Sequence, residues 1–173
     1  MSETWNIDAS HSSVDFKVRH MGISSVKGSF DSFSGSVIQE NDELKEVNVD
    51  IEVASINTND EQRDGHLKSA DFFDVENNPK MSFKSTAISK NADGSYAVTG
   101  DLSMKGTSKP VSFQATIGEA ITDPWGMTRA AAEITGTLNR KDWGLSWNQI
   151  LEAGALLVGE EVSFNFDVQA VKG

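Results

Sequence analysis

The residues best suited to chemistry gather in one short stretch, NTNDEQRDGHLKSADFF, at residues 57–73. Arg63, His66 and Lys68 lie close together there, and Phe72 follows them. Cationic side chains donate strong hydrogen bonds to phosphate or carboxylate oxygens, and arginine offers a planar fork suited to phosphate. Arg63, His66 and Lys68 are therefore candidates for contact with the polar head of a ligand, with Phe72 beside them. The alternative is a solvated helix stabilised by neighbouring charges four residues apart.

Metal-dependent hydrolysis is a second chemistry that the residues allow. The chain has three histidines, His11, His20 and His66, and a zinc site takes three or four nitrogen or oxygen ligands. No HExxH pair, GxSxG elbow, Walker loop or GxGxxG turn occurs in the sequence. We expect a protein that is not an enzyme and needs no cofactor, with the metal-dependent hydrolase kept as the alternative.

Composition excludes several other classes of protein. The chain has 173 residues, no cysteine and a net charge of −11, so disulfides and thiolate chemistry are absent. The negative charge disfavours nucleic acids and anionic membranes as partners. No run approaches the roughly 20 apolar residues of a membrane span, and MSETWNIDASHSS does not resemble a secretory signal. These features predict a cytoplasmic protein without stable membrane insertion; a homodimer stays open.

The elements that must position these residues are strands. Polar and apolar residues alternate over six long segments and two short ones, which is typical of antiparallel strands with one dry face. The segments are 14–20, 33–37, 47–53, 81–83, 96–104, 111–117, 130–138 and 162–168. Turn residues separate several of them, as in NADG at 91–94 and DPWG at 123–126. The pattern predicts one all-β domain, residues 1–173, of about eight or nine strands.

Strands of this kind form either a sandwich or a barrel. Closure into a barrel removes exposed sheet edges. Small residues occur among large ones on the predicted dry faces, and an eight-stranded barrel either fills with side chains or holds one small ligand. Small inner residues favour the cavity, although a strand glycine also marks bends. The small residues are Gly35, Gly100, Ala115, Ala130, Ala132 and Gly136.

One segment, residues 60–71, breaks the alternation. Asn59 or Asp60 is a suitable N-cap, and Glu61 suits the first turn of a helix. The segment predicts one short helix after the strand region Ile51–Ile56, over a barrel mouth or along its rim. On that helix Arg63 and Asp64 either face a ligand or pair with strand residues and hold the helix to the barrel.

Four blocks of sequence resemble the YceI-like family. They are WNIDASHSSVDFKVRHMGISSVKGSFDSFSG, INTNDEQRDGHLKSADFFDVENNPKMSF, GDLSMKGTSKPV and GTLNRKDWGLSWN, in the family's order. The resemblance covers nearly the whole chain. It implies a lipocalin-like antiparallel β-barrel that binds polyisoprenoid lipids or similar long-chain amphiphiles in its lumen. Some members of the family resemble secreted proteins with a leader, whereas the opening residues of this sequence lead us to expect none.

An isoprenoid, an isoprenoid quinone or a related lipid is thus the expected partner, for carriage, storage or sensing. Each methylene that such a chain buries contributes about 0.8 kcal/mol. A protein-interaction module with no lumenal ligand is the other alternative. The apolar residues expected to line the lumen are Val14, Phe16, Val18, Phe33, Met81, Phe83, Leu102, Met104, Phe113, Phe164 and Phe166.

Histidine and tryptophan complete the set of candidates. His20 lies on the apolar face of the first predicted strand, where it either contacts a head group or is a core residue. Trp143 and Trp147 lie four residues apart and are expected at a barrel entrance or over the core. Trp5 and Trp125 are expected to close the barrel ends.

Overall fold

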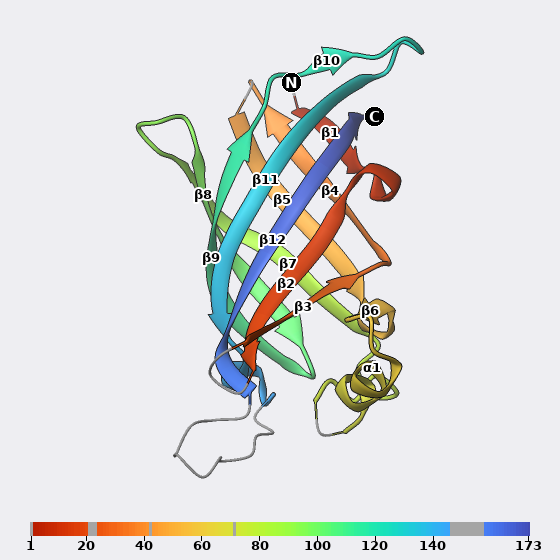
Figure 1. The fold of residues 1–173 in the computed structure, drawn as a ribbon. Coiled ribbons are helices and arrows are strands. Elements are labelled where there is room, and N and C mark those ends of the chain that lie inside the picture. Colours follow the sequence, from red (N-terminus) through yellow and green to blue (C-terminus); the bar gives the residue numbers. More distant parts are fainter. Residues whose placement is uncertain (1, 21–23, 42, 71, 146–157) are drawn as a thin grey trace.

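The alternating segments form long antiparallel strands in a computed structural model of the chain (Figure 1). The structure describes residues 2–20, 24–41, 43–70, 72–145 and 158–173. Its strands are β1 (Ser2–Ile7), β2 (Ser13–His20), β3 (Ser24–Phe30), β4 (Phe33–Glu40), β5 (Glu43–Glu52), β6 (Ile56–Asn57), β7 (Lys80–Lys90), β8 (Tyr96–Met104), β9 (Thr107–Ile117), β10 (Ile121–Thr122), β11 (Thr128–Asn139) and β12 (Val158–Lys172). The helices are α1 (Glu61–Lys68) and the single turns η1 (Ala9–His11), η2 (Val53–Ser55) and η3 (Arg140–Trp143).

Eight strands close into a barrel, in the order β1, β4, β5, β7, β8, β9, β11, β12 and back to β1. The longest seam joins β11 to β12, from Arg129↔Val171 to Asn139↔Glu161. Along its other edge β12 pairs first with β2 and then, near its end, with β1. β1 and β2 therefore act as one long strand broken at η1. Next to them, β3 pairs with β2 and β4 pairs with β1, so β3 and β4 likewise act as one interrupted strand. The predicted antiparallel barrel of about eight strands is confirmed.

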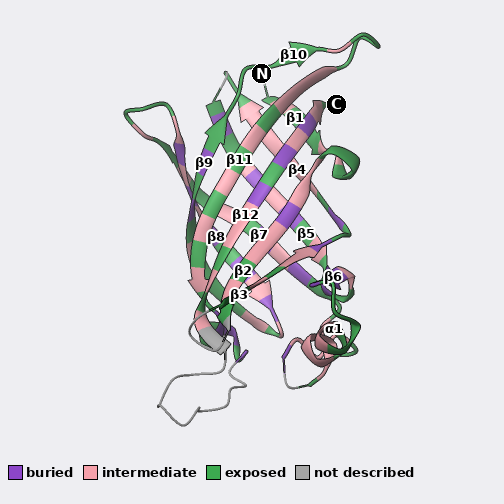
Figure 2. Cartoon of the chain, viewed as in Figure 1, coloured by how far each residue is buried: buried purple, intermediate pink, exposed green. Residues whose placement is uncertain are grey.

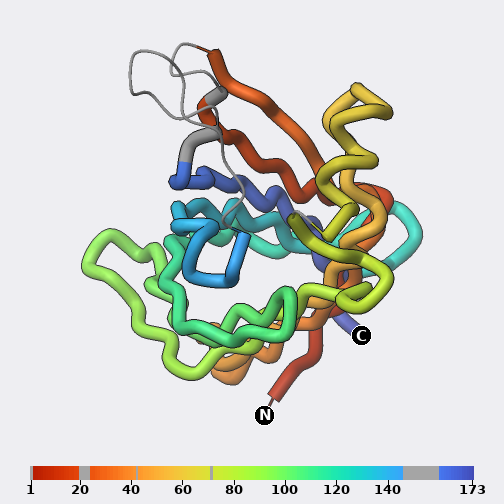
Figure 3. The backbone as a smooth tube through the Cα atoms, turned by 90° about the horizontal axis from the view of Figure 1, so that it is seen from below, coloured from red at the N-terminus to blue at the C-terminus, as the bar shows by residue number. Residues whose placement is uncertain are grey.

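The two-residue period of the sequence matches the alternation of buried and exposed residues along the barrel strands. In β8, buried residues alternate with more exposed ones from Tyr96 to Met104. Figure 2 shows the same alternation of buried and exposed bands on neighbouring strands, and Figure 3 shows the strands arranged around the barrel axis. The apolar faces consequently point toward a shared interior.

A polar cluster joins β11 to neighbouring segments at one end of the seam between β11 and β12. Arg129 on β11 donates from Nη1 to Asp8 at 2.8 Å and from Nε to Asp123 at 2.7 Å. Its Nη1 also donates to Gln169 Oε1 at 3.2 Å. Hydrogen bonds from Ser10, Arg129 and His11 lower the pKa of Asp8. The bond from Arg129 is the leading cause that lowers the pKa of Asp123.

The inward glycines do not simply leave empty space. A Cβ on Gly136 would lie 2.7 Å from Cζ of Phe164, and a Cβ on Gly28 would lie 2.4 Å from Cζ of Phe16. Each glycine therefore provides room for an aromatic ring that lies across the strand. The expectation that small inner residues leave room for a cavity holds for Ala115, Ala130 and Ala132, which line it, whereas Gly35, Gly100 and Gly136 are not among the lining residues.

The one α-helix in the described ranges, α1, lies at the end of the barrel opposite the chain termini (Figure 1). It has eight residues and none of them is fully buried. Among all the residues that the structure describes, no helix is long and apolar enough to cross a lipid bilayer.

Candidate ligand-binding site

The barrel encloses a cavity of about 710 Å³. All eight barrel strands contribute side chains to its wall, and most of these are aliphatic or aromatic. Sites for single small molecules are usually roughly 300–1,000 Å³ in volume and mostly apolar. The cavity is thus large enough for one ligand and has an interior suited to an apolar chain.

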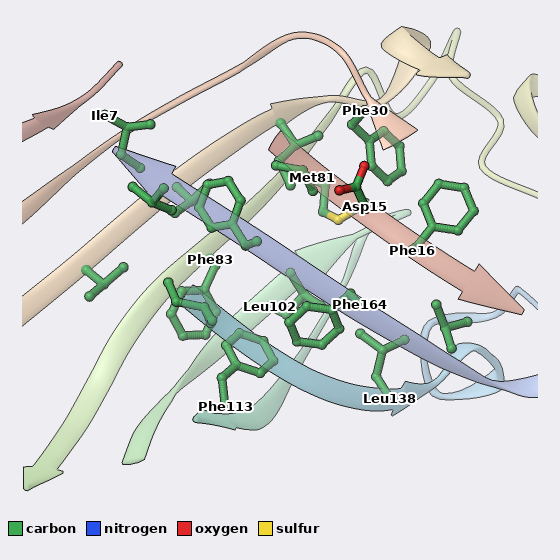
Figure 4. A pocket seen from close by; sticks show the side chains of 18 of the residues that line it. Ile7, Asp15, Phe16, Phe30, Met81, Phe83, Leu102, Phe113, Leu138 and Phe164 are labelled. Carbon is green, nitrogen blue, oxygen red and sulfur yellow. The ribbon is translucent and has the colours of Figure 1, made fainter. Parts of the chain in front are cut away.

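Phenylalanines form the middle of the cavity wall (Figure 4). The rings of Phe83 and Phe113 have centroids 5.0 Å apart, and Phe113 meets Phe164 edge to face at 4.6 Å. Phe16 and Phe30 form a further pair at 5.4 Å. Because these rings come from β2, β3, β7, β9 and β12, only closure of the barrel brings them together.

Polar groups are concentrated at the α1 end of the cavity. α1 and its N-cap contribute Asp60, Gln62, Arg63 and His66 to the lining, and Arg140 joins them from η3. At the opposite end Gln39 accepts a hydrogen bond from Trp5 Nε1 at 3.1 Å. The cavity is consequently amphipathic along its length, with charged side chains of both signs, Asp60 as well as Arg63 and Arg140, at the α1 end.

Local sequence explains where α1 begins. Asp60 is the N-cap, and its carboxylate accepts the backbone N–H of Arg63 at 3.1 Å. Glu61 and Asp64 lie in the first turn, where the helix dipole favours negative charge, and His66 and Lys68 lie in the last turn. The predicted short helix is confirmed, and of the two candidate N-caps, Asn59 and Asp60, the structure uses Asp60.

Buried Thr58 connects α1 to the barrel. Arg63 donates to the Thr58 hydroxyl from Nε and to its carbonyl from Nη2, both at 2.9 Å. Asp64 accepts from the Thr58 N–H at 2.9 Å and from its hydroxyl at 2.5 Å. Thr58 follows β6 directly, and only 4% of it is exposed. Arg63 and Asp64 therefore hold the helix to the strand, while Arg63 also lines the cavity.

Side chains from two distant segments of the chain meet at the α1 end. The His66 ring packs edge to face on Phe72 at 5.1 Å, and the Arg140 guanidinium lies over the same ring at 5.9 Å. Arg140 is only 3% exposed and donates from Nη1 to the Leu145 carbonyl at 2.5 Å. Burial lowers the pKa of Arg140. This cluster places a buried cation beside the polar end of the cavity.

Sequence reasoning missed Arg140. It lies in the GTLNRKDWGLSWN block, directly after β11, and no periodicity distinguishes it from an exposed loop cation. An arginine at the end of an inward-facing strand, beside a buried tryptophan, is the only signal available. Trp143 itself is 2% exposed and donates from Nε1 to the Leu102 carbonyl at 2.8 Å, so it covers the core.

Most of the predicted ligand-contact residues line the cavity. Those that do are Val14, Phe16, Val18, Arg63, His66, Phe72, Met81, Phe83, Leu102, Met104, Phe113, Phe164 and Phe166. Phe33 and Lys68 are not among the lining residues; Phe33 instead packs edge to face on Phe166 at 5.5 Å. The side chain of His20 and the whole of Trp147 lie outside the described residues.

The histidines considered for a metal lie on separate elements. His11, in η1, hydrogen-bonds with Asp8 at 2.8 Å, whereas His66 belongs to α1. Over the described ranges, no group of three or more histidine or carboxylate side chains is placed to hold a metal ion.

Trp5 and Trp125 behave differently. Trp5 is 7% exposed and lines the cavity at the end near the termini. Trp125 is 82% exposed, so the expectation that it closes a barrel end is wrong. The short β10–β11 hairpin projects it beyond the barrel wall (Figure 1).

Comparison with known proteins identifies the family of the chain. Residues 5–170 match the YceI-like domain. A UPF0312 protein from Pseudomonas putida (strain GB-1) is 40% identical over 149 residues, covering 84% of this chain and 78% of that protein. The YCEI protein of Campylobacter jejuni has a similar structure, with a TM-score of 0.77 and 28% identity over 90% of each chain. A polyisoprenoid binding domain from Saccharophagus degradans shares the fold, with a TM-score of 0.74 and 15% identity over 98% of each chain. The chain therefore belongs to the YceI-like domain family.

Proposed function

We propose that the barrel binds one long-chain amphiphile in its lumen, with the apolar chain among the phenylalanines and the polar head at the α1 end. An isoprenoid, an isoprenoid quinone or a related lipid fits this description. The amphipathic cavity of about 710 Å³ is the observation that carries the proposal. The Saccharophagus degradans domain, described as polyisoprenoid binding, lends support through the shared fold. We assign the site a binding role and no catalytic one.

Burial of the chain supplies the affinity in this proposal. Each methylene moved from water into the lumen contributes about 0.8 kcal/mol, so even a short buried segment yields several kcal/mol. Met81 and Met104 line the same space, and flexible thioethers adapt to an irregular chain. Carriage, storage and sensing all use such a site, and we propose carriage because the cavity reaches exposed residues at both ends of the barrel.

His66 is the candidate for contact with the head group. Arg63 already donates two hydrogen bonds to Thr58, which favours a structural role for most of its guanidinium. His66 lines the cavity above Phe72, next to Gln62. An imidazole can donate a hydrogen bond to a quinone or alcohol oxygen, so a neutral head suits this end of the cavity.

Native mass spectrometry of the purified protein tests the proposal. We expect a bound hydrophobic species, and its removal should lower the melting temperature. A ligand at a hundred times its Kd stabilises a protein by about 2.7 kcal/mol, which corresponds to roughly 5–10 °C for a chain of this size. Readdition of an isoprenoid quinone or an isoprenoid alcohol should restore the difference.

A matched pair of variants on β11 locates the ligand. Ala132 lines the cavity and Glu133, the next residue, is exposed on the outer face. Ala132→Trp should fill the lumen and abolish lipid retention, whereas Glu133→Trp should leave retention unchanged. Equal retention by both variants would show that the lipid binds elsewhere, and a protein that retains no long-chain lipid at all would refute the proposed function.

A further inference from the structure

The large apolar side chains that the described residues expose all lie in one short segment. They are Ile117, Ile121, Trp125 and Met127, with exposed fractions of 39%, 65%, 82% and 43%. The segment 117–127, termed the apolar segment below, joins β9 to β11 through β10 at the end of the barrel opposite α1 (Figure 1). Exposed apolar side chains that are scattered singly are ordinary, whereas their concentration in one place marks a contact surface.

The backbone N–H groups at the tip of the apolar segment, residues 123–127, all have hydrogen-bond partners within the tip. The Asp123 carboxylate accepts the backbone N–H groups of Trp125 and Met127, both at 2.9 Å. The backbone also bonds across the turn, from Asp123 N to the Met127 carbonyl at 2.8 Å and from Gly126 N to the Asp123 carbonyl at 3.0 Å. Arg129 pairs with the Asp123 carboxylate at 2.7 Å and neutralises its charge. The turn therefore presents Trp125 on a hydrogen-bonded frame.

Such a frame suits contact with lipid. A backbone group that enters a region without water must already be hydrogen-bonded, because an unpaired group there costs several kcal/mol. Tryptophan is enriched where a bilayer meets water, since its ring has a large apolar surface and one polar group.

The apolar segment is also continuous with the cavity. Ile117, Gly118 and Ala120 belong both to the segment and to the cavity lining, and all three are exposed. An apolar ligand that leaves the lumen at this end meets apolar side chains first. Because transfer of a long apolar chain into water is unfavourable, an exit of this kind requires an apolar destination.

We propose that the apolar segment docks on the surface of an uncharged lipid bilayer, with Trp125 inserted at the headgroup level, and that the lumenal ligand exchanges with the bilayer at this end. Net charge selects the type of bilayer. The chain carries a charge of −11 and Glu119 is exposed within the segment, so a zwitterionic surface is preferred to an anionic one. The exchange step rests on the proposed function, whereas the docking step does not.

Flotation of the full chain with phosphatidylcholine vesicles tests the docking. Trp125→Ser should weaken partitioning about ten- to 100-fold, since burial of a large apolar side chain contributes roughly 1.5–3 kcal/mol. Trp125→Phe should keep most of the affinity. Ala92→Ser, an exposed change in the turn between β7 and β8, is the matched control and should behave like the parent chain. Melting temperatures should stay unchanged, because Trp125 is exposed.

A parent chain that does not bind phosphatidylcholine vesicles would overturn the docking proposal, and so would equal binding by Trp125→Ser. Brominated phosphatidylcholine supplies a second readout. It should quench the tryptophan fluorescence of the parent chain more than that of Trp125→Ser, and an equal fractional loss in both proteins would count against insertion of this residue.

Transfer of the bound lipid to acceptor vesicles tests the exchange. Trp125→Ser should retain its ligand in native mass spectra and release it to vesicles about tenfold more slowly. Release at the parental rate would refute the exit route even if docking occurs. A parent chain that holds no lipid would instead refute the proposed function, and the flotation result would still decide the docking.

Discussion

Replacement of Gly100 by alanine tests a position in the barrel where the added methyl group would meet backbone atoms of the neighbouring strand. A Cβ on Gly100 would lie 2.4 Å from the backbone oxygen of Lys84 and 2.6 Å from Cζ of Phe83. The Phe83 ring can rotate into the lumen, but the Lys84 oxygen belongs to the neighbouring strand β7 and cannot move alone. Overpacking of this kind costs about 1–3 kcal/mol. We place Gly100→Ala at the upper end, about 2–3 kcal/mol.

Gly136→Ala, on β11, is the matched control. Its Cβ would meet only side-chain atoms, Cζ of Phe164 at 2.7 Å and Cδ1 of Phe113 at 2.9 Å. Both rings line the cavity and have space to move into it. Alanine also reduces the conformational entropy of the unfolded chain, which stabilises by about 0.4–1 kcal/mol. The two effects nearly cancel, so we expect a change within about 1 kcal/mol.

Urea unfolding of the delipidated proteins measures both values, with thermal unfolding as a check. Gly100→Ala should lower the melting temperature by about 4–12 °C, at roughly 2–4 °C for each kcal/mol in a chain of this size. Gly136→Ala should leave it nearly unchanged. An equal and large loss for both variants would refute the reasoning, because it would mean that the rings over Gly136 have no empty space beside them.

Three further predictions concern side chains that hold the site in place. Thr58→Val should destabilise the protein by about 2–3 kcal/mol in urea unfolding, because it removes hydrogen bonds to two charged side chains; a loss below the error of the measurement would show that α1 does not depend on Thr58. Trp143→Phe should cost about 1–3 kcal/mol, since the buried Leu102 carbonyl loses its donor; fully preserved stability would contradict this. Arg129→Gln should change how the stability of the protein depends on pH in the acid range. The hydrogen bond from Arg129 lowers the pKa of Asp123 in the folded state, so this stabilisation is present above about pH 4 and is lost as the pH falls through the lowered pKa. Melting temperatures of the variant should thus be lower at neutral pH and converge with the parental values in acid, and parallel curves would be inconsistent with the proposed linkage.

The head-group assignment depends on a distinction that the structure makes between neighbouring residues. Arg63 and Asp64 are occupied by Thr58, whereas His66 lies over Phe72 at the cavity wall. Substitution of Arg63 is therefore expected to reduce stability as well as any ligand affinity. A clean test of the head-group contact uses His66 in place of Arg63.

Local patterns in the sequence were enough to predict most of the strands and the helix. Alternation places every second side chain on one face, and this depends only on the geometry of a strand. β8 begins and ends where the alternating segment 96–104 does. Asp60 begins α1 because a carboxylate at that position satisfies a backbone donor three residues later. Strands without clear alternation, such as β3 and the short β10, were not predicted.

Contacts between distant segments were decided only by the tertiary structure. The rings that lie over glycines, the bonds from Arg63 to Thr58 and the burial of Arg140 join residues whose proximity no local pattern encodes. Trp125 is a large aromatic residue of the kind expected in a core, but it is exposed because its hairpin projects past the end of the barrel. The volume of the lumen likewise depends on how side chains from eight strands pack together, whereas alternation specifies only that they face inward.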